Sequence, residues 1–449
     1  MTGKEQAARA IAQRLREAGY VAYLAGGCVR DRLLGREPKD FDVATSAPAS
    51  VVQERFDKTV PVGVQFGVVV VVLDGEAVEV ATFRSDAAYA DGRHPSGVHF
   101  GSPEEDARRR DFTINGMFID PVTDAVIDYV GGRADLRARV IRAIGDPAAR
   151  IGEDRLRMLR AIRIAARLGF AIEPASLAAI RVAAATITDI AWERIGDEAV
   201  RMLCDSEGGS ARRAFELLDT TGLLTAILPE IAALKGVEQS PDYHPEGDVF
   251  VHTLGLLEQL RHPTETLALA ALLHDVAKPR CAQRGAARIT FYGHCEIGAE
   301  MAMRICQRLR RSRETWERVA VLVRDHLRLL HAPRMRMSTL KRFLAAQAIE
   351  ELLELGRLDA LASNKDLTYY DFCIQKLHEL GTAALKPSPL LRGRDLLELG
   401  FPPGPLFTQI LAAVADAQLD GLLHSRAQAV DWVRARYAVR SPGSPRCSG

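Results

Sequence analysis

Two neighbouring glycines followed by two alternating aspartates constrain this chain more than any other feature. Gly26 and Gly27 end an apolar run, and Asp40 and Asp42 flank a phenylalanine further along. The alternation is typical of a short strand over 40–44, in which both carboxylates project from one face about 7 Å apart at Cα. That pair suits two Mg²⁺ ions and phosphoryl or nucleotidyl transfer, although Asp-x-Asp alone is more often a solvated turn. The glycines favour the metal site, because they let the backbone approach a polyphosphate.

A third carboxylate lies in a predicted hairpin. Residues 66–73 form a β-branched apolar run, Asp74 and Gly75 form a turn, and residues 77–83 return as the partner strand. Glu79 stands between two valines of the returning strand. It either faces solvent or completes the two-metal site from a neighbouring strand, and we favour the second interpretation.

The composition is that of a soluble globular protein without a general affinity for polyanions. A chain of 449 residues is expected to form two to four domains. Hydrophobic residues make up 47% and charged residues 26%, and 59 basic residues face 58 acidic ones. A nucleic-acid partner would therefore have to be bound by local clusters of arginine.

The cysteines and the N-terminus predict a cytoplasmic protein. The seven cysteines are scattered, with no C-x-x-C pair, which indicates reduced thiols rather than disulfides or a structural zinc site. The first 20 residues have the pattern of an amphipathic helix and not of a signal peptide. No apolar run reaches membrane-spanning length, so we expect no membrane partner.

Three motifs together carry a resemblance to a known family. GGCVRD at 26–31, DFD at 40–42 and RRRDFTINGM at 108–117 resemble the head of the bacterial-type (class II) tRNA CCA-adding enzyme and poly(A) polymerase family. The resemblance implies an α+β protein, with a polymerase-β-like nucleotidyltransferase head built on a small mixed sheet and an all-α neck and body. It also implies a tRNA 3′ end, CTP and ATP as partners, no DNA, and two Mg²⁺ ions at the catalytic site.

The same resemblance implies the residues that bind the nucleotide. Arg108, Arg109 and Arg110 could form an ordinary solvated face, but beside a triphosphate site we favour phosphate binding. Asp111 and its neighbours are expected to contact the ribose and to favour NTP over dNTP. The predicted nucleotide-binding residues are Gly26, Gly27, Arg30, Arg110, Asp111, Asn115, Asp154, Arg157, Arg160 and Arg163, and the predicted catalytic carboxylates are Asp40, Asp42 and Glu79.

A helix predicted from Glu153 carries the residues expected to select the base. Its arginines recur at three- and four-residue steps, which alone would be a solvated stripe, but EDRLR resembles the base-selecting EDxxR motif of the family. Asp154 and Arg157 then share one helical face. An arginine donates to N3 of cytosine or N1 of adenine, and an aspartate accepts from the exocyclic amine. Guanine and uracil would fail both contacts, so we expect selection of C and A without a template.

A second cluster resembles the HD-superfamily phosphohydrolases. His274 and Asp275 follow an apolar helical pattern, and a single such pair would usually be structural. The ordered set of histidines and aspartates around them implies a site for one or two divalent transition metals (Mn, Fe, Ni or Co), with Asp275 bridging. The predicted ligands are His252, His274, Asp275, His294, His326 and Asp359. Phosphatase or cyclic phosphodiesterase chemistry follows from this resemblance.

The domain organisation follows from these motifs and from the proline-rich breaks. We predict a head over 1–145, a helical neck and body for base selection and tRNA binding over 146–240, an all-α HD domain over 245–375 and a C-terminal helical piece over 386–440. The tail 441–449 is predicted to be disordered.

The first interpretation is a tRNA nucleotidyltransferase that adds CCA. The stretch 60–72 resembles the CCA-adding branch, and the loop containing Asp91, Gly92 and Arg93 is present, whereas CC-only enzymes tend to lack it. An enzyme that adds only A, or a poly(A) polymerase, remains as the alternative. A more remote alternative is an HD phosphohydrolase with a non-catalytic RNA-binding head.

Overall fold

The computed structural model of the chain describes residues 2–63, 66–86, 98–240, 247–285 and 289–437. The chain folds into two compact units. The first contains residues 1–237, 257–268 and 304–312, and the second contains 238–256, 269–303 and 313–449. The domain boundaries predicted from the sequence remain predictions.

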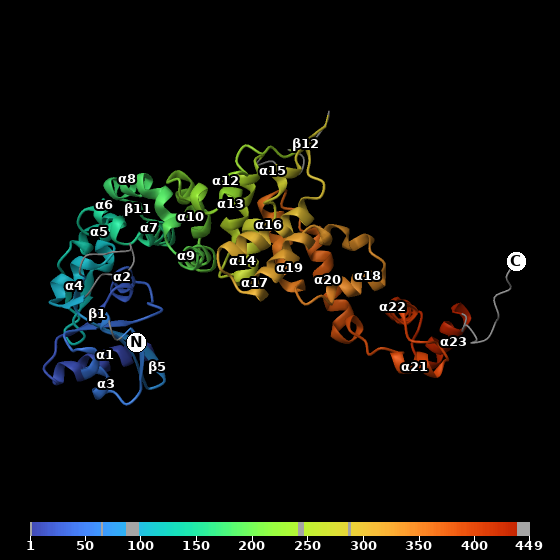
Figure 1. The fold of residues 1–449 in the computed structure, drawn as a ribbon, viewed down its shortest axis with the longest axis horizontal. Coiled ribbons are helices and arrows are strands. Elements are labelled where there is room, and N and C mark those ends of the chain that lie inside the picture. Colours follow the sequence, from blue (N-terminus) through green and yellow to red (C-terminus); the bar gives the residue numbers. More distant parts are fainter. Residues whose placement is uncertain (1, 64–65, 87–97, 241–246, 286–288, 438–449) are drawn as a thin grey trace, which may run out of the picture. The chain divides into compact units, whose positions relative to one another are not determined.

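A seven-stranded mixed sheet forms the head, in the order β3-β4-β5-β2-β1-β8-β9. Its strands β1 and β5 are labelled in Figure 1. Strands β2 and β5 are parallel, and the other neighbours are antiparallel. The predicted small mixed sheet is thereby confirmed. The strands are β1 (Ala22–Ala25), β2 (Asp42–Thr45), β3 (Thr59–Gly63), β4 (Val68–Leu73), β5 (Glu76–Thr82), β8 (Met117–Ile119) and β9 (Val126–Asp128), and a separate pair joins β6 (Arg84–Asp86) to β7 (Val98–Phe100).

The helices of the head pack around this sheet. Helix α1 buries one face of small and branched residues, as its amphipathic pattern predicted, and contacts β1, β2 and β5. On the other side, Phe83 and Phe118 meet edge to face with their ring centroids 6.0 Å apart. The helices are α1 (Gly3–Glu17), α2 (Gly27–Leu33), α3 (Ala49–Arg55), α4 (Pro103–Arg109), the 3₁₀ turn η2 (Thr113–Asn115) and α5 (Gly132–Ala138).

The predicted hairpin is present, and its turn has the expected chemistry. Asp74 and Gly75 have φ values of 53° and 83°, so both central residues lie in the left-handed region that tight hairpins need. The turn joins β4 to β5, and Glu79 pairs with Val70 across it.

The acidic strand begins later than predicted. We expected residues 40–44, but β2 starts at Asp42, so Asp40 does not share a strand face with it. The reason lies in the neighbouring strand: Ala25, the last residue of β1, pairs with Asp42, and the chain then turns at Gly26. Asp40 has no ladder partner there and instead accepts a hydrogen bond from Lys4.

Helices dominate the rest of the first unit, as predicted. Helix α7 packs against α9 and α10, and its buried residues are apolar except for Arg157. The elements are β10 (Val140–Ile141), α6 (Pro147–Glu153), α7 (Leu156–Leu168), β11 (Ala171–Ile172), α8 (Pro174–Ala183), η3 (Ala184–Asp189), α9 (Trp192–Cys204), α10 (Ser210–Thr220), α11 (Leu223–Ile227) and α12 (Pro229–Ala232).

The region beyond is almost entirely helical as well. Its elements are α13 (Val249–Gln259), α14 (Glu265–Leu273), α15 (Lys278–Cys281), the pair β12 (Gln283–Arg284) and β13 (Ile289–Thr290), α16 (His294–Arg308), α17 (Arg313–Asp325), η4 (Arg328–Arg334), α18 (Met337–Leu344), α19 (Ile349–Ala362) and α20 (Thr368–Leu385). The C-terminal helices α21 (Gly393–Glu398), α22 (Pro405–Leu419) and α23 (Arg426–Arg436) surround a hydrophobic cluster of their own.

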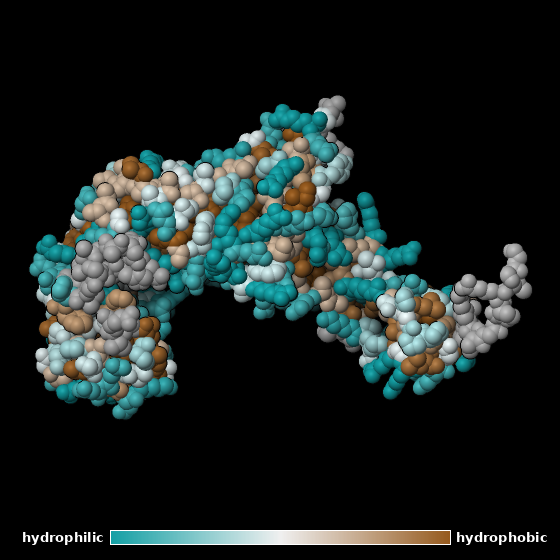
Figure 2. Space-filling view, viewed as in Figure 1, coloured by the Kyte–Doolittle hydropathy of each residue, from teal (hydrophilic) through white to brown (hydrophobic). Residues whose placement is uncertain are grey.

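The surface visible in Figure 2 is mainly hydrophilic, with hydrophobic residues in small separate patches. Within the described ranges, no helix combines the length and the hydropathy that a bilayer crossing requires. Two predictions fall outside those ranges: the loop with Asp91, Gly92 and Arg93, and the tail 441–449.

Candidate nucleotide-binding and metal sites

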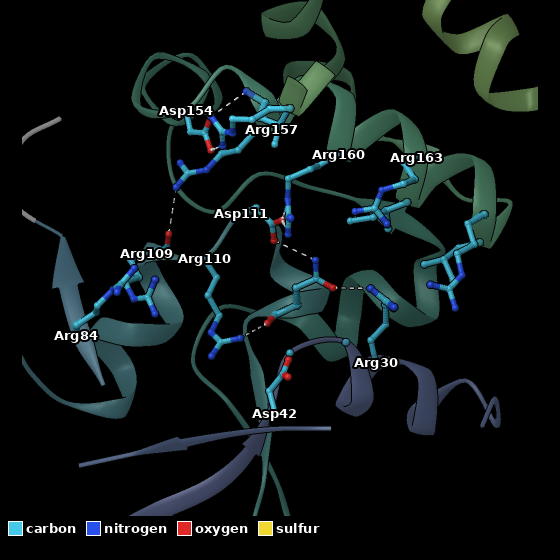
Figure 3. Close-up of a pocket in the computed structure, with 18 residues that line it drawn as sticks. Arg30, Asp42, Arg84, Arg109, Arg110, Asp111, Asp154, Arg157, Arg160 and Arg163 are labelled. Carbon is cyan, nitrogen blue, oxygen red and sulfur yellow. Dashed lines mark hydrogen bonds and ion pairs between the residues drawn. The ribbon is translucent and has the colours of Figure 1, made fainter. Parts of the chain in front are cut away.

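A cavity of about 450 Å³ lies in the first unit, and far more arginines than aspartates line it (Figure 3). The start of α2, strand β2, the end of α4 and the inward face of α7 all contribute to it. Its lining residues are Gly26, Gly27, Arg30, Asp42, Arg84, Arg109, Arg110, Asp111, Asn115, Asp154, Leu156, Arg157, Arg160, Arg163, Ile164, Arg167, Leu168 and Arg194. Such a cationic lining suits a polyanion such as a nucleoside triphosphate.

Gly26 permits a close approach of the backbone at the floor of this cavity. Its φ is 77°, and a Cβ added there would stand 3.2 Å from Arg110 Nη1 and 3.7 Å from Asp42 Oδ2. A side chain would be strained and would crowd both groups, so the position requires glycine.

Of the three predicted catalytic carboxylates, Asp42 reaches the cavity. Burial, and then the charge of Glu79 beside it in the parallel register, raise the pKa of Asp42 to about 6. A divalent cation bound at Asp42 would oppose both effects and favour the ionised carboxylate. The donor set fits Mg²⁺, which takes hard oxygen ligands.

Asp40 and Glu79 do not line the cavity. The Asp40 side chain is 77% exposed and pairs with Lys4, whose Nζ lies 2.6 Å from Oδ1. Glu79 is exposed on the face of β5 opposite its buried neighbours Val78 and Val80. The charges of both carboxylates nevertheless raise the pKa of Asp42. Their catalytic roles remain predictions.

Asp111 anchors a buried chain of hydrogen bonds. It accepts from Arg160 Nε at 2.9 Å and Nη2 at 2.7 Å, and from Asn115 Nδ2 at 3.0 Å. Asn115 Oδ1 in turn accepts from Arg30 Nη1 at 2.8 Å. Burial favours a neutral carboxyl, but Arg160 and Asn115 outweigh it and lower the pKa of Asp111 to about 2. Four predicted nucleotide-binding residues thus form one rigid network.

The residues expected to select the base line the cavity, but the helical face predicted for them is wrong. Helix α7 begins at Leu156, and Asp154 lies before it in an extended conformation. The physical reason is that Asp154 accepts a hydrogen bond from the backbone N–H of Leu156 at 3.0 Å, which favours a turn ahead of the helix over a helical position.

Arg194 holds the Asp154 carboxylate in place. Its Nη1 and Nη2 lie 3.1 and 2.8 Å from the two carboxylate oxygens. Arg157 is held separately, by the Glu153 carboxylate and by the carbonyls of Arg150 and Arg109. Both candidate base-reading groups are therefore fixed by protein contacts rather than free to rotate.

Some lining residues were not predicted to bind a nucleotide. Arg84 follows the hairpin, and no local pattern distinguished it. Arg167 continues the series of arginines at three- and four-residue steps on α7, and this spacing could have identified it as a lining residue. Arg163, which was predicted, donates to Glu198 at 2.7 Å.

The second unit brings all six predicted metal ligands together. His252, His274 and Asp359 have ligand atoms within 4.8 Å of one another, and so do His294, Cys295 and His326. Asp275 lies between the two groups. Its Oδ2 is 3.1 Å from His274 Nε2, and its Oδ1 is 3.6 Å from His294 Nε2 and 3.9 Å from His326 Nε2. The geometry matches a bridging carboxylate.

Backbone carbonyls orient three of the imidazoles. Nδ1 of His274, His294 and His326 lies 3.0, 2.7 and 2.7 Å from the carbonyl of the third residue before it. A carbonyl only accepts, so Nδ1 carries the proton and the lone pair of Nε2 faces the cluster. Burial lowers the pKa of His326 to about 4, which keeps that ring neutral at neutral pH.

The environment of Asp275 also supports metal binding by this cluster. Asp275 is 2% exposed, and its Oδ1 is buried and accepts no hydrogen bond. A buried carboxylate oxygen in that state is costly unless a cation binds it. Sequence reasoning missed two neighbours: Lys278, whose Nζ is 2.7 Å from Asp275 Oδ2, and Cys295. A cavity of about 550 Å³ adjoins the cluster.

Three families match successive parts of the chain. Residues 22–142 match the Poly A polymerase head domain, and residues 169–235 match the probable RNA and SrmB-binding site of polymerase A. Residues 248–363 match the HD domain.

Curated CCA-adding enzymes are similar to about half of the chain. That of Geobacillus stearothermophilus is 46% identical over 228 residues, which are 51% of this chain and 55% of that protein. That of Bacillus pumilus is 39% identical and covers 56% of this chain and 63% of its own length. In these alignments the chain spans little more than half the length of the relatives it matches.

Solved structures extend the similarity over nearly the whole fold. The Bacillus stearothermophilus CCA-adding enzyme in complex with CTP superposes with a TM-score of 0.74 at 29% identity, and 97% of this chain and 98% of that one are covered. The Thermotoga maritima CCA-adding enzyme complexed with tRNA has a TM-score of 0.58 at 19% identity, and covers 95% of this chain and 94% of its own, which shows the shared fold alone.

Proposed function

Because this chain belongs to the bacterial-type tRNA CCA-adding enzyme and poly(A) polymerase family and carries an HD domain, we propose that it adds CCA to tRNA 3′ ends. CTP and ATP are the donors, the acceptor is a tRNA that lacks part or all of CCA, and the compartment is the cytoplasm. The single observation that carries this proposal is the arginine-lined cavity, in which Asp42, the Gly26 turn and the Asp154–Arg157 pair meet. Addition of A alone, or of a poly(A) tail, is the alternative.

The reaction is an in-line transfer. The terminal hydroxyl oxygen of the RNA bonds to the α-phosphorus, the bond to the β-phosphate bridge breaks, and pyrophosphate leaves. Mg²⁺ held by Asp42, with Asp40 and Glu79 as further carboxylates, would make the hydroxyl more acidic and offset charge on the α-phosphate.

The chain's own residues bind the triphosphate and hold it in position. Arg109 and Arg110 are both fixed by Asp106, with Nη2 of each 2.7 and 3.0 Å from its carboxylate, so their remaining N–H groups are aimed without further loss of rotamer freedom. The Gly26 turn lets the phosphates approach the backbone, and the hydrogen-bonded residues Asp111 and Arg160 line the same cavity.

Base selection would use the pair Asp154 and Arg157. The carboxylate accepts from the exocyclic amine of cytosine or adenine, and the guanidinium donates to the unprotonated ring nitrogen. Guanine and uracil would make neither of these contacts, at about 1–3 kcal/mol for each lost contact.

The test uses tRNA transcripts that end before CCA, after C and after CC, each with one labelled NTP. Ordered addition of C, C and A, with G and U refused, is the expected result. Incorporation of A alone onto the CC end would replace the proposal with an A-adding enzyme, and long A tails on unrelated RNA would replace it with a poly(A) polymerase.

A second activity is supported by the histidine cluster. We propose that the HD site is a metal-dependent phosphohydrolase, because all four histidines lie within 3.9 Å of the Asp275 carboxylate, whose Oδ1 is buried and accepts no hydrogen bond. A divalent transition metal held there would supply a hydroxide nucleophile and a Lewis acid for a phosphate ester. The test is hydrolysis of a generic aryl phosphate and a generic aryl phosphodiester after reloading with Mn²⁺, Ni²⁺ or Co²⁺. Wild-type protein that is inactive with every metal, or activity that persists in Asp275→Asn, would refute it.

A further inference from the structure

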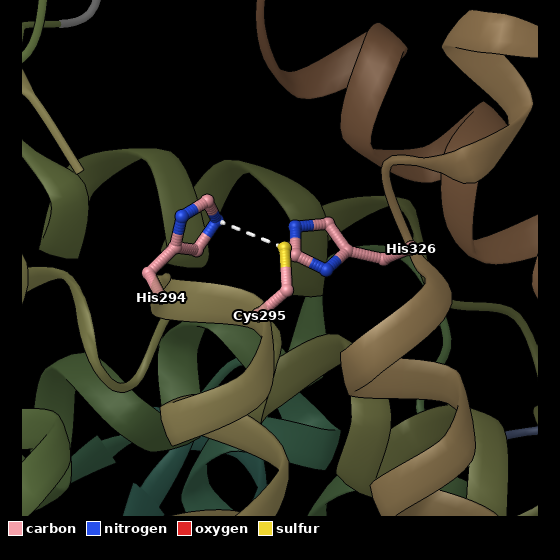
Figure 4. A group of neighbouring side chains, drawn as sticks. All are labelled: His294, Cys295 and His326. Atoms are coloured by element: carbon pink, nitrogen blue, oxygen red, sulfur yellow. Dashed lines mark hydrogen bonds between the residues drawn. The ribbon is translucent and has the colours of Figure 1, made fainter. Parts of the chain in front are cut away.

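Cys295 directly follows a predicted metal ligand and points into the same cluster. Its Sγ lies 3.6 Å from His294 Nε2, and Figure 4 shows it between the rings of His294 and His326. The three ligand atoms lie within 4.8 Å of one another. The two rings are 5.5 Å apart at their centroids and tilted by 67°, so they face a common point rather than stack.

The distances match a tetrahedral metal site that contains sulfur. Zinc binds thiolate at about 2.3 Å and imidazole at about 2.0–2.1 Å, so a tetrahedral angle places the two ligand atoms about 3.6 Å apart. The separation of Cys295 Sγ and His294 Nε2 has that value. A hydrogen bond between a thiol and an imidazole would also fit this one distance. The positions of the other possible ligands therefore distinguish a metal site from a hydrogen bond.

The fourth donor is Asp275 Oδ1. It lies 3.6 Å from His294 Nε2 and 3.9 Å from His326 Nε2, whereas two nitrogen or oxygen ligands of tetrahedral zinc stand about 3.4 Å apart. This oxygen is buried and accepts no hydrogen bond. Asp275 therefore offers an unsatisfied ligand atom beside the two imidazoles that also lie next to the thiol.

The other half of the cluster has different chemistry. His252, His274 and Asp359 offer only nitrogen and oxygen, together with Asp275 Oδ2. Sulfur is the softer ligand and favours Zn²⁺ over Mn²⁺ or Mg²⁺. The two halves of one cluster are thus built for ions of different character.

We propose that His294, Cys295, His326 and Asp275 form a Zn²⁺ subsite within the HD cluster, separate from an N/O subsite at His252, His274 and Asp359. The inference rests on the proposed function of the HD site as a metal centre. On binding, the Cys295 thiol releases its proton to solvent, and the thiolate donates a lone pair to the metal. With four protein ligands the Zn²⁺ subsite would be closed, so its ion would hold the site together.

The first measurement needs no substitution. Full-length protein is stripped with a chelator and reloaded with Co²⁺, which takes the place of Zn²⁺ and shows a thiolate-to-cobalt charge-transfer band when sulfur is a ligand. The second is alkylation with iodoacetamide, mapped by peptide mass spectrometry. Zn²⁺ is expected to slow the labelling of Cys295 and to leave that of Cys281, a buried cysteine of the same unit outside both ligand groups, unchanged.

Variants then assign the ligand. Cys295→Ser and Cys295→Ala are expected to lose the cobalt–thiolate band and to weaken Zn²⁺ binding by roughly a hundredfold or more, beyond the 10- to 100-fold typical of residues outside the ligand shell. Cys281→Ala is the matched control and should keep both. Metal content by mass spectrometry should fall by one zinc in Cys295→Ala and retain the ion of the other subsite.

The outcomes separate this inference from the proposed hydrolase. Wild-type protein that binds a metal and hydrolyses the aryl phosphates but shows no thiolate band refutes only the zinc subsite. Wild-type protein that binds no divalent metal refutes both. A thiolate band with one zinc per chain supports the subsite even if no phosphate ester is hydrolysed.

Discussion

The arginine-lined cavity and the histidine cluster differ in how their charged groups are balanced. In the cavity, most of the charged groups are held by protein partners: Asp111 by Arg160, Asp154 by Arg194, and Arg163 by Glu198. In the cluster, Asp275 Oδ1 is buried without a hydrogen bond, and burial keeps the His326 imidazole beside it neutral. The first site is arranged before its ligand arrives, and the second requires its cations to be complete.

This difference predicts which perturbations each site tolerates. A structure held by long side chains in ion pairs changes gradually when one contact is removed, because the others persist. A cluster whose ligands share one buried carboxylate loses its ions together when that carboxylate is lost.

Asp42→Ala should lower nucleotide addition by about a thousandfold or more, because it removes the predicted catalytic carboxylate that lines the cavity. Single-turnover addition of CTP to a tRNA transcript measures the effect. Metal content and aryl phosphate hydrolysis at the HD site should not change. The exposed Glu54→Ala on α3 is the control. Near-normal addition by Asp42→Ala would refute the two-metal proposal.

Asp275→Asn should remove the HD-site metals and phosphate ester hydrolysis together, because the carboxylate touches both ligand groups. Metal content after purification and CCA addition are measured on the same sample. Addition of C and A should persist, and His378→Ala on α20, outside both ligand groups, should behave as wild type. Loss of only one ion would mean that the carboxylate does not bridge.

Arg194→Ala should reduce the preference for CTP over UTP. Arg194 acts through Asp154 and not on the base, because its guanidinium holds the Asp154 carboxylate in position. The expected loss is about 1–3 kcal/mol, or roughly five- to 150-fold in relative kcat/KM. Asp154→Asn should have an effect of the same direction, and the exposed Asp189→Asn on η3 should have none. Equal losses for both nucleotides would indicate a purely structural role for Arg194.

The smallest effect concerns stability in acid. The pKa of Asp111 is lowered to about 2 in the folded state, so its ionised form stabilises the fold above the usual value of 3.8. That contribution, about 2 kcal/mol, is lost as the pH falls from about 4 towards 2. Denaturant unfolding should show that Asp111→Asn removes this pH dependence relative to wild type. Parallel stability curves for the two proteins in this range would contradict the assignment.

Local sequence patterns predicted those helices and strands whose formation depends on residues close together in the sequence. The apolar face of α1, the β-branched run before Asp74 and Gly75, and the helical period after residue 148 all predicted the elements found there. The order of the HD histidines also predicted a cluster that the structure brings together, because each histidine lies at or near a helix terminus or on a buried helical face.

The tertiary structure decided what depends on neighbours distant in sequence. Asp40 lies outside the predicted strand, because the neighbouring strand β1 ends at Ala25. Asp154 lies outside the predicted helix, because its carboxylate accepts a hydrogen bond from the Leu156 N–H and binds Arg194. Strand period and helix period say nothing about such partners.

By itself, the sequence determined the chemistry available to this protein: a glycine turn beside aspartates, a basic stripe, and histidines paired with an aspartate. Only the tertiary structure decided that Asp42 and not Asp40 lines the cavity, and that a cysteine joins the histidines. The physical reason is that a residue's type follows from the chain alone, whereas its burial and its partners depend on long-range packing and electrostatics.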